Sequence, residues 1–420
     1  MKKYCIGLFA ALTAPLCHAA NGIYLTGYGA TSTGLGGADI SHVAGGNALI
    51  ANPAGLGNIS RHRQDYTLSA FSIDRITHKD EFNKSTRLAN ENGVILGWGG
   101  GWRVDNALVI GAAVNVAGGL GFVYNGLNTP FGNRDNLASL FSLFKFSLGG
   151  SWNVSERLRV GLAVATNYAS AEQDFYANTS VANQDQAFFG IKVRNLDGWG
   201  GDIKLGLQYQ INDDLLFGIN YTSESHIDLN GGHLQVNYEA INLGRVTYND
   251  AKMGGLELPQ ELGAGLAWTA RPDLRLHLEA NWFDWHRATG GLTLTASNPD
   301  GPVPAGAENL RQRSTLTMRS EVVYSVGIGK SLPGNKVIRA GYSYHDLVLE
   351  RNSLSPSFAL VPQHDLSIGF GTPLRQGLRF DIAFAYQPRT SESYNNPGLP
   401  FGRSTAVNES FSIHITLSQH

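Results

Sequence analysis

Short segments of alternating apolar and polar residues, separated by turns, recur through most of this sequence. From Leu274 to Trp282 every even-numbered position is apolar, and polar residues such as Arg275 and Glu279 lie between them. Successive side chains of a β-strand point to opposite faces, so this pattern predicts a strand with one apolar and one wetter face. The same alternation is found in the segments 203–209, 215–221, 262–268, 322–328, 338–344, 366–370, 378–386 and 411–417.

The strands are long and carry aromatic residues, which favours a membrane barrel over a soluble fold. A β-sandwich or a lipocalin-like barrel would also alternate, because one strand face is buried there too. Strands of soluble proteins, however, peak near about five or six residues, whereas several segments here are longer. The opposite face is small or polar, in keeping with 51 Gly and only 16% charged residues, and would fill a dry core poorly. Aromatic residues near strand ends, as in an interfacial girdle, are Tyr209, Tyr221, Trp268, Trp282, Tyr344 and Tyr386.

Connections of two lengths give the barrel its polarity. Tight turns such as 212–214, 270–273 and 333–336 are rich in Gly, Pro, Asn and Asp. They alternate with segments that we expect to be long loops, at 119–143, 171–197, 229–257, 287–316 and 349–362. Short periplasmic turns and long external loops are the arrangement of outer-membrane barrels. We therefore predict an all-β, transmembrane, antiparallel barrel of about fourteen strands over residues 61–420, with both termini in the periplasm.

The first nineteen residues have the organisation of a secretory signal peptide. Lys2 and Lys3 precede an apolar run, and Cys17 and Ala19 are small residues at a cleavage position. A lipoprotein site at Cys17 is the less favoured alternative, because the preceding Leu16 is bulky. Cys5 and Cys17 are the only two cysteines, so a chain cleaved after Ala19 has no disulfide. Net charge is −2, which gives no reason to expect a nucleic-acid partner.

Two segments depart from the alternation. Residues 20–60 are rich in glycine and poor in charge, unlike a free tail, which is more polar; they could fold compactly inside the barrel. In residues 134–146, RDNLASLFSLFKF, apolar residues recur at helical spacing, which predicts a short amphipathic helix in a long outer loop. Such a helix either packs on its own loop or collects apolar ligand. The residues proposed for ligand capture are Leu137, Leu140, Phe141 and Phe144.

The order of several motifs resembles one family. The stretch Asn52-Pro53-Ala54-Gly55-Leu56, which follows a small-residue N-terminal region, is similar to the plug motif of the long-chain fatty-acid outer-membrane transporters (FadL/TodX type). The segments 256–259 and 281–285 resemble a hairpin of that family, and 339–344 with 361–362 and 378–388 resemble its C-terminal third. The resemblance spans nearly the whole chain after the signal peptide. One departure is the final residue, His420, where such barrels usually end in an aromatic residue.

The resemblance implies a fold and a mechanism. Residues 20–60 would be a hatch in the lumen, with Asn52, Pro53, Ala54 and Gly55 as its marker. Apolar outer loops would capture the ligand, which would leave sideways through the wall at a kinked strand. The third strand, 106–121, contains four glycines and is the expected place, because glycine in a strand often marks a bulge. Three basic residues face the lumen, where they could pair with a ligand carboxylate or form ion pairs with groups such as Glu279; they are Lys204, Arg275 and Arg339.

The sequence thus predicts an outer-membrane transporter that takes up hydrophobic molecules by passive diffusion, with long-chain fatty acids as the first expectation. Uptake of monoaromatic hydrocarbons is the alternative, and a barrel enzyme or a general porin is a more distant one. No Gly-x-Ser-x-Gly stretch occurs, which disfavours hydrolases with a nucleophile elbow, and the histidines show no metal-ligand spacing. We expect no catalysis, cofactor or metal. The expected partners are the ligand, outer-membrane lipid and lipopolysaccharide, and the barrel assembly machinery, for a monomeric protein.

Overall fold

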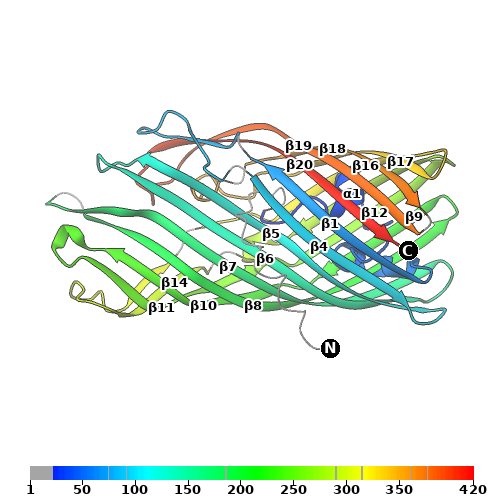
Figure 1. The fold of residues 1–420 in the computed structure, drawn as a ribbon, viewed down its shortest axis with the longest axis horizontal. Helices are drawn as coiled ribbons and strands as arrows, with labels where there is room; N and C mark the ends of the chain where they lie inside the picture. Colours follow the sequence, from blue (N-terminus) through cyan, green and yellow to red (C-terminus); the bar gives the residue numbers. More distant parts are fainter. Residues whose placement is uncertain are drawn as a thin grey trace.

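The chain forms a single antiparallel sheet that closes on itself (Figure 1). The structure is a computed structural model, and it describes residues 22–420 except 74, 91, 185–186, 289–290, 314–315, 360 and 376. The predicted signal peptide, 1–19, lies outside the described residues. Strand β1 (His62–Ser72) pairs with β4 (Asn92–Arg103) on one side and with β20 (Arg403–Gln419) on the other. This last pairing joins the end of the chain to its beginning, and it closes a barrel of fourteen strands, as predicted.

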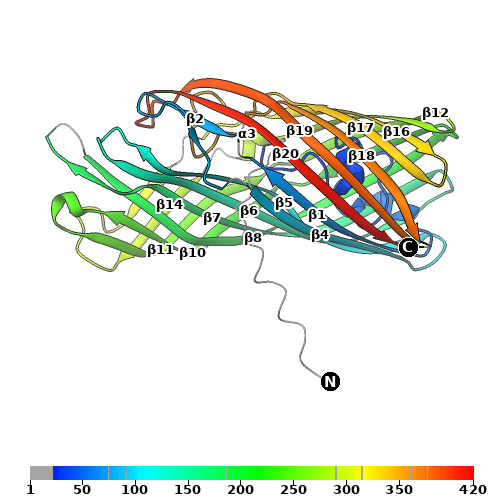
Figure 2. The same cartoon turned by 45° about the horizontal axis from the view of Figure 1, so that its top comes forward.

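The remaining eleven barrel strands follow the order of the sequence, each paired with its neighbours and inclined to the long axis (Figure 2). Several barrel strands are built from two successive segments, one in each half of the barrel. The single segments are β5 (Leu108–Asn128), β6 (Arg134–Asn153), β7 (Leu158–Ala182), β8 (Ala187–Asn212), β17 (Lys336–Tyr344), β18 (His364–Arg375) and β19 (Leu378–Asn395). The composite ones are β9 (Leu215–Thr222) with β10 (Ser225–Asn237), β11 (Arg245–Leu258) with β12 (Glu261–Arg271), β13 (Leu274–Phe283) with β14 (Thr293–Pro299), and β15 (Leu310–Arg313) with β16 (Glu321–Leu332).

The predicted alternation places apolar side chains on the outside of the barrel. Leu148, Trp152 and Ile368 are each at least 60% exposed, whereas in-between residues such as Asp202 and His277 are buried on the inner face. An exposed apolar band is stable only in contact with lipid. None of the helices among the described residues is long and apolar enough to cross a membrane. The tight turns lie together at the end of the barrel that carries the C-terminus, called the short-turn end below (Figure 1).

Several predicted loops are in fact extended strands. Strand β5 continues to Asn128 and β6 begins at Arg134, so only a short turn is left of the expected loop 119–143. Strands β7, β8, β10 and β11 extend in the same way into the segments 171–197 and 229–257. Because these hairpins pair beyond the apolar band, the end opposite the short-turn end projects as a sheet, and we call it the hairpin end.

The predicted amphipathic helix at 134–146 is wrong, because these residues belong to β6. They pair with β5 on one side and with β7 on the other, and these ladder hydrogen bonds join segments that are not neighbours in a helix. In a strand, Leu137 and Phe141 share one face while Leu140 and Phe144 share the other. Helical spacing arose here because this strand has apolar residues on both of its faces.

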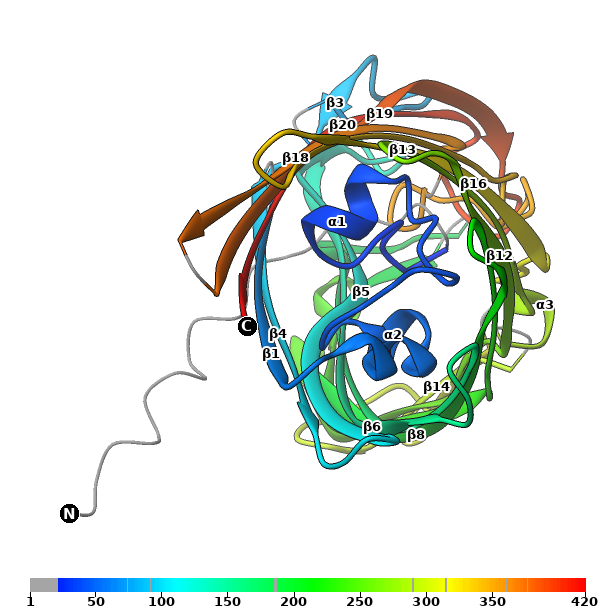
Figure 3. The same cartoon turned by 90° about the vertical axis from the view of Figure 1, so that its right-hand side faces the viewer.

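The residues before β1 lie inside the barrel (Figure 3). This N-terminal segment, residues 22–61, contains α1 (Gly29–Gly34), α2 (Ala48–Ala51) and the 3-10 helix η1 (Pro53–Asn58). Contacts join α1 to β17–β20 and η1 to β5–β8, so the segment fills the lumen across its width at the short-turn end. The residual short elements are β2 (Thr77–Lys79), β3 (Thr86–Arg87), η2 (Glu239–Ile241) and α3 (Trp285–Ala288).

The hairpin half of the barrel is filled by apolar side chains. We call this group the apolar cluster; it includes residues from the barrel strands and from the loops 73–90 and 345–362 that fold inward. Its most buried large members include Phe122, Tyr124, Leu137, Tyr176, Tyr248, Leu349 and Phe401. The cluster continues down to Tyr24 of the N-terminal segment, whose ring lies 5.5 Å from that of Trp285 in α3. Thus an apolar interior lies directly above the N-terminal segment.

Candidate ligand passage in the barrel wall

The wall of the barrel is interrupted between β4 and β5. Backbone pairing of these strands ends at Gly97 and Asn115, and among the described residues no pair joins positions 92–96 to β5. Contact resumes at Asn90, whose side-chain amide donates a hydrogen bond to the carbonyl of Gly121 at 3.0 Å. The two strands therefore frame a gap, which we call the wall window.

A bulge in β5 produces the window. The register between β5 and β6 shifts between Val116 and Gly118, and the phenol of Tyr28 donates to the carbonyl of Ala117 at 2.7 Å. A bulge leaves one residue outside the ladder and bends its strand. Gly118 lies so close to the N-terminal segment that a Cβ there would be 2.0 Å from the carbonyl oxygen of Ile23. The irregular strand is the third barrel strand, in which the sequence suggested a kink.

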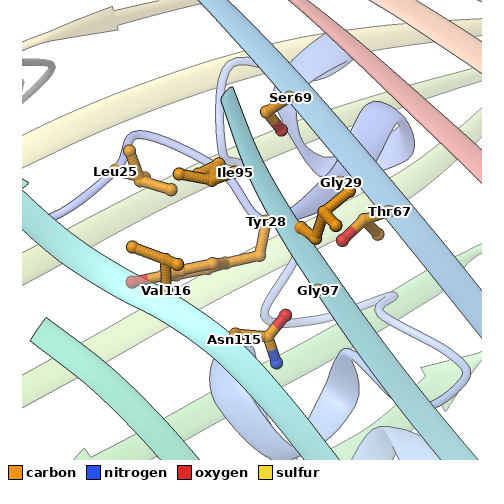
Figure 4. A pocket seen from close by; sticks show the side chains of 11 residues that line it. Leu25, Tyr28, Gly29, Thr67, Ser69, Ile95, Gly97, Asn115 and Val116 are labelled. Carbon is orange, nitrogen blue, oxygen red and sulfur yellow. The ribbon is translucent and has the colours of Figure 1, made fainter. Parts of the chain in front are cut away.

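A small pocket opens at the window, between the wall and the N-terminal segment (Figure 4). Gly97 keeps it open, because a Cβ at this position would lie 2.4 Å from Oδ1 of Asn115. The Asn115 side chain is 5% exposed, and its Nδ2 has no hydrogen-bond partner among the described residues. Burial raises the pKa of the Tyr28 phenol, which stays a neutral donor. The lining of this window pocket includes Leu25, Tyr28, Thr67, Ile95, Asn115 and Val116.

Asn52 fixes the N-terminal segment to the wall at strand β8. Its side-chain amide donates to the carbonyls of Ile40 at 2.9 Å and Leu207 at 3.0 Å, and its Oδ1 accepts from the backbone N–H of Ala54 at 3.1 Å. The last contact caps η1, and Pro53 occupies the first helical position, where no N–H is needed. One fully buried side chain thus joins two parts of the segment to strand β8.

Glycines on the inner wall make this contact possible. A Cβ at Gly206 would lie 2.0 Å from Oδ1 of Asn52, and one at Gly161 would lie 2.2 Å from the backbone nitrogen of Ala54. Both glycines belong to wall strands, β8 and β7. A glycine inside a strand often marks a close approach of another backbone. The abundance of glycine on the inner face therefore reflects the space that the N-terminal segment occupies.

Two of the predicted carboxylate-binding residues are engaged with protein groups. Nζ of Lys204 donates to the carbonyl of Ile50 at 2.6 Å and lies 3.2 Å from a carboxylate oxygen of Glu261. The guanidinium of Arg339 is 2.8 Å from Asp381, and both side chains are at least nine-tenths buried. Neither residue lines the window pocket.

The third candidate, Arg275, faces the N-terminal segment near the short-turn end. Its guanidinium lies 2.7 Å from a ring nitrogen of His42. Glu279, which the sequence offered as an ion-pair partner, instead accepts a hydrogen bond from the backbone N–H of Ile40 at 2.7 Å. The basic residues and Glu279 therefore contact the N-terminal segment or the wall around it.

The four residues proposed for ligand capture are divided between two places. Leu137 and Phe141 belong to the apolar cluster. Phe144 is the cross-strand partner of Val116 at the window, and Leu140 shares its face of β6. Among the described residues no group of three or more His, Cys, Asp and Glu has the geometry of a metal site.

Sequence reasoning missed the residues that line the window. Tyr28 and Leu25 are large residues in a segment of small ones, and Asn115 interrupts an otherwise apolar strand. These residues could have been noticed in the sequence, because burying a polar side chain among apolar ones is unfavourable unless it finds a hydrogen-bond partner. The window itself depends on which residues of β4 and β5 pair, and that is a property of the folded barrel.

Comparisons with known proteins agree with this architecture. The profile of the outer membrane protein transport proteins (OMPP1/FadL/TodX) matches residues 11–415. Outer membrane protein P1 of Haemophilus influenzae is 24% identical over 314 residues, which are 67% of this chain and 63% of that protein. The chain thus matches somewhat less than two thirds of the length of this relative.

Solved structures with a similar fold include three barrels. The toluene transporter TodX of P. putida superposes with a TM-score of 0.76 at 18% identity, over 94% of this chain and 99% of TodX. The toluene transporter TbuX of Ralstonia pickettii gives a TM-score of 0.74 at 17% identity with the same coverage. A FadL homologue of Pseudomonas aeruginosa gives 0.72 at 14% identity, again with 94% and 99% covered. Because the family profile covers nearly the whole chain, this protein belongs to the outer membrane protein transport proteins (OMPP1/FadL/TodX) and lies in the outer membrane.

Proposed function

We propose that the protein takes up a neutral hydrophobic small molecule across the outer membrane, with monoaromatic hydrocarbons such as toluene as the preferred class. Family membership supports a transport function. Two of the structures with the same fold, TodX and TbuX, are toluene transporters. Long-chain fatty acids are the alternative cargo, and the chemistry of the window separates the two classes.

The observation that carries this proposal is the lining of the window pocket. It is made of apolar, hydroxyl and amide side chains, and none of its lining residues is charged. A carboxylate that enters an enclosed site without a cationic partner loses its hydration, which is costly. Lys204 and Arg339 are already held by Glu261 and Asp381. A neutral ring needs no such partner.

The route follows the apolar surfaces of the lumen. Ligand partitions from outside into the apolar cluster at the hairpin end, which faces outward because short turns are periplasmic. It then moves past Tyr24 to the window pocket and leaves between β4 and β5 into the bilayer. The N-terminal segment acts as the hatch that blocks the straight path to the periplasm. Transport is passive, and it is driven by consumption of the ligand inside the cell.

The test is uptake of radiolabelled toluene and oleate by cells that lack their own hydrophobe transporters, with and without this protein. We expect the protein to accelerate uptake of toluene and to leave oleate uptake at the background rate. Acceleration of oleate alone would overturn the assignment of the cargo. Acceleration of neither molecule, with the folded barrel present in the outer membrane, would overturn the function itself.

A variant tests the window separately. Gly97→Phe places a ring in the window pocket, where even a Cβ contacts Asn115, and toluene uptake should fall to the background rate. Gly329→Phe is the matched control, since a Cβ at Gly329 in β16 meets nothing within 4 Å. Mobility of the unheated protein on a gel checks that both variants fold. Normal uptake by a folded Gly97→Phe variant would exclude exit through the window.

A further inference from the structure

A second pocket adjoins the window pocket, between the N-terminal segment and the wall. It shares Leu25 and Gly27 with the window pocket, and its other lining residues come from the N-terminal segment and from β1, β18, β19 and β20. Two residues, Asp365 and His414, are ionisable, and several others carry hydroxyl groups. The polar lining residues are Thr26, Thr33, Asp365, Ser367, Ser412 and His414.

Asp365 is the carboxyl group of this pocket. It is 4% exposed, and its Oδ2 accepts a hydrogen bond from Oγ1 of Thr26 at 3.2 Å. No lysine or arginine is among the residues that line the pocket. The nearest arginine along the sheet, Arg339, pairs with Gly369 of β18 in the ladder and is bound to Asp381. A ligand carboxylate would therefore meet an acidic side chain whose basic neighbour, His345, is already paired with Glu321 at 3.6 Å.

Ser367 provides the second observation. It lies two residues after Asp365 on β18, so that both side chains point to the same face. The residue is 7% exposed, and its Oγ has no hydrogen-bond partner among the described residues. A buried hydroxyl without a partner is unfavourable. Ser367 lines the pocket together with Asp365. One face of the pocket therefore presents a hydrogen-bond acceptor and a hydroxyl group that has no partner among the described residues.

His414 links the two pockets. One of its ring nitrogens lies 2.7 Å from Oγ of Ser69, which lines the window pocket, and the other lies 2.9 Å from Oγ of Ser412. The ring also packs edge-on against Phe71, with centroids 5.6 Å apart. Polar contacts therefore run continuously along the inner wall from the window pocket to the second pocket.

We propose that the second pocket is a subsite for the hydroxyl group of a hydroxylated hydrophobe, a phenol rather than a carboxylic acid. The pocket has about 20 Å³ of free space, enough for a hydroxyl group but not for a ring. The hydroxyl therefore enters the pocket, donates to Asp365 and accepts from Ser367, while the ring stays at its mouth on the side of Leu25 and Phe71. A hydroxyl group is both donor and acceptor, so it satisfies both side chains. This inference rests on the proposed transport of neutral rings, and it narrows the class to those with a hydrogen-bond donor.

The test compares three ligands with the same ring. Toluene, p-cresol and p-toluate are titrated at pH 7 into the purified protein in detergent, and the ratio of the dissociation constants of toluene and p-cresol is measured. At this pH a phenol is neutral and a carboxylic acid is ionised. We expect p-cresol to bind most tightly and p-toluate most weakly. If p-toluate bound most tightly of the three, the proposal would be overturned.

Two variants locate the contact. Asp365→Asn should weaken the binding of p-cresol by about tenfold, because an amide oxygen is a weaker hydrogen-bond acceptor than a carboxylate. The dissociation constant of toluene, which has no hydroxyl group, should not change. Ser367→Ala should weaken the binding of p-cresol by about threefold, because a hydrogen bond between two neutral groups contributes less than one to a charged group. Asp213→Asn makes the same chemical change in an exposed turn and should alter neither ligand.

The outcomes separate the two proposals. A ratio that is the same in the wild type, Asp365→Asn and Ser367→Ala excludes the hydroxyl subsite, even where toluene uptake proceeds normally. If Asp365→Asn does not fold, Ser367→Ala alone is sufficient. A ratio of the toluene and p-cresol dissociation constants equal to that of the wild type would then exclude the hydroxyl subsite. If the wild-type protein did not accelerate toluene uptake by cells, the proposed function itself would fail.

Discussion

The two halves of the lumen are filled by different chemistry. At the short-turn end, the N-terminal segment is held by directional hydrogen bonds from side chains such as Asn52, Lys204 and Glu279. At the hairpin end, strands and inward loops meet in the apolar cluster, where rings such as those of Tyr176 and Phe401 lie 5.9 Å apart. One half is polar and glycine-walled, and the other is apolar and aromatic.

This difference suggests a division of labour. Buried hydrogen bonds are satisfied in only one arrangement, so they specify a single position for the N-terminal segment. Apolar contacts are non-directional, and a hydrophobic molecule can replace some of them without leaving a polar group unpaired. The polar half is therefore suited to keep the lumen closed, and the apolar half to accept ligand. The window lies where the two halves meet.

Removing the N-terminal segment should have the largest effect. Deletion of residues 22–60 takes away the material that spans the lumen at the short-turn end, and ion conductance in a planar bilayer should rise to that of an open pore. The closed wild-type barrel should conduct little. If the variant without residues 22–60 had the same ion conductance as the wild type and still took up hydrophobic molecules, the N-terminal segment would not be the barrier to ions.

A single substitution in the wall should also raise the ion conductance, although less than the deletion does. Gly206→Val places a side chain where a Cβ alone would lie 2.0 Å from Asn52, and overpacking of this kind costs about 1–3 kcal/mol. We expect faster amide exchange in residues 50–58 and a measurable rise in conductance. Gly329→Val, in open space, is the matched control. Unchanged exchange in the first variant would show that the segment can shift without loss.

The sequence was sufficient for the repeating part of this fold. The alternation from Leu274 to Trp282 corresponds to β13, and the turn before it lies where Pro272 and Asp273 predict. These features are local, since a strand face and a tight turn are each encoded within a few residues. The closing pair, β1 with β20, followed from the strand count rather than from any residue.

Features that depend on distant pairing were not predictable in the same way. Leu137 and Phe144 have helical spacing, but pairing of β6 with both neighbours makes them part of a strand. The window is the same kind of feature, because it requires that β4 and β5 separate above Gly97. The presence of polar residues such as Asn115 can be read from the sequence, but the groups that they face cannot.

In the apolar half, one ring should matter for stability and not for closure. Phe401 is 2% exposed and contacts the rings of Phe175, Tyr176 and His78. Phe401→Ala leaves a cavity, and such changes cost about 3–5 kcal/mol. Amide exchange should increase in the loops at the hairpin end, while residues 50–58 and the conductance should be unaffected. Increased exchange in both regions would mean that the two halves are coupled.

The smallest effect is expected from the polar contact that holds the loop 79–85 at the hairpin end. Asp80 accepts hydrogen bonds from the side chain of His78 at 2.9 Å and from the backbone N–H groups of Phe82 at 2.8 Å and Asn83 at 2.6 Å. Burial opposes ionisation of the carboxyl, but these hydrogen bonds outweigh it and hold the pKa of Asp80 below its usual value.

The sign of the pH dependence follows from this lowered pKa. The folded loop binds fewer protons than the unfolded one, so its stability is fully present above the ordinary pKa of an aspartate and is lost as the pH falls through the lower, folded-state value. Protection of amides 79–83, corrected for intrinsic exchange, should therefore fall on acidification below about pH 4. Asp80→Asn should lower the protection already at pH 7 and remove its pH dependence. Protection that rises on acidification would contradict a carboxylate at this position, and a change in conductance would contradict the independence of the two halves.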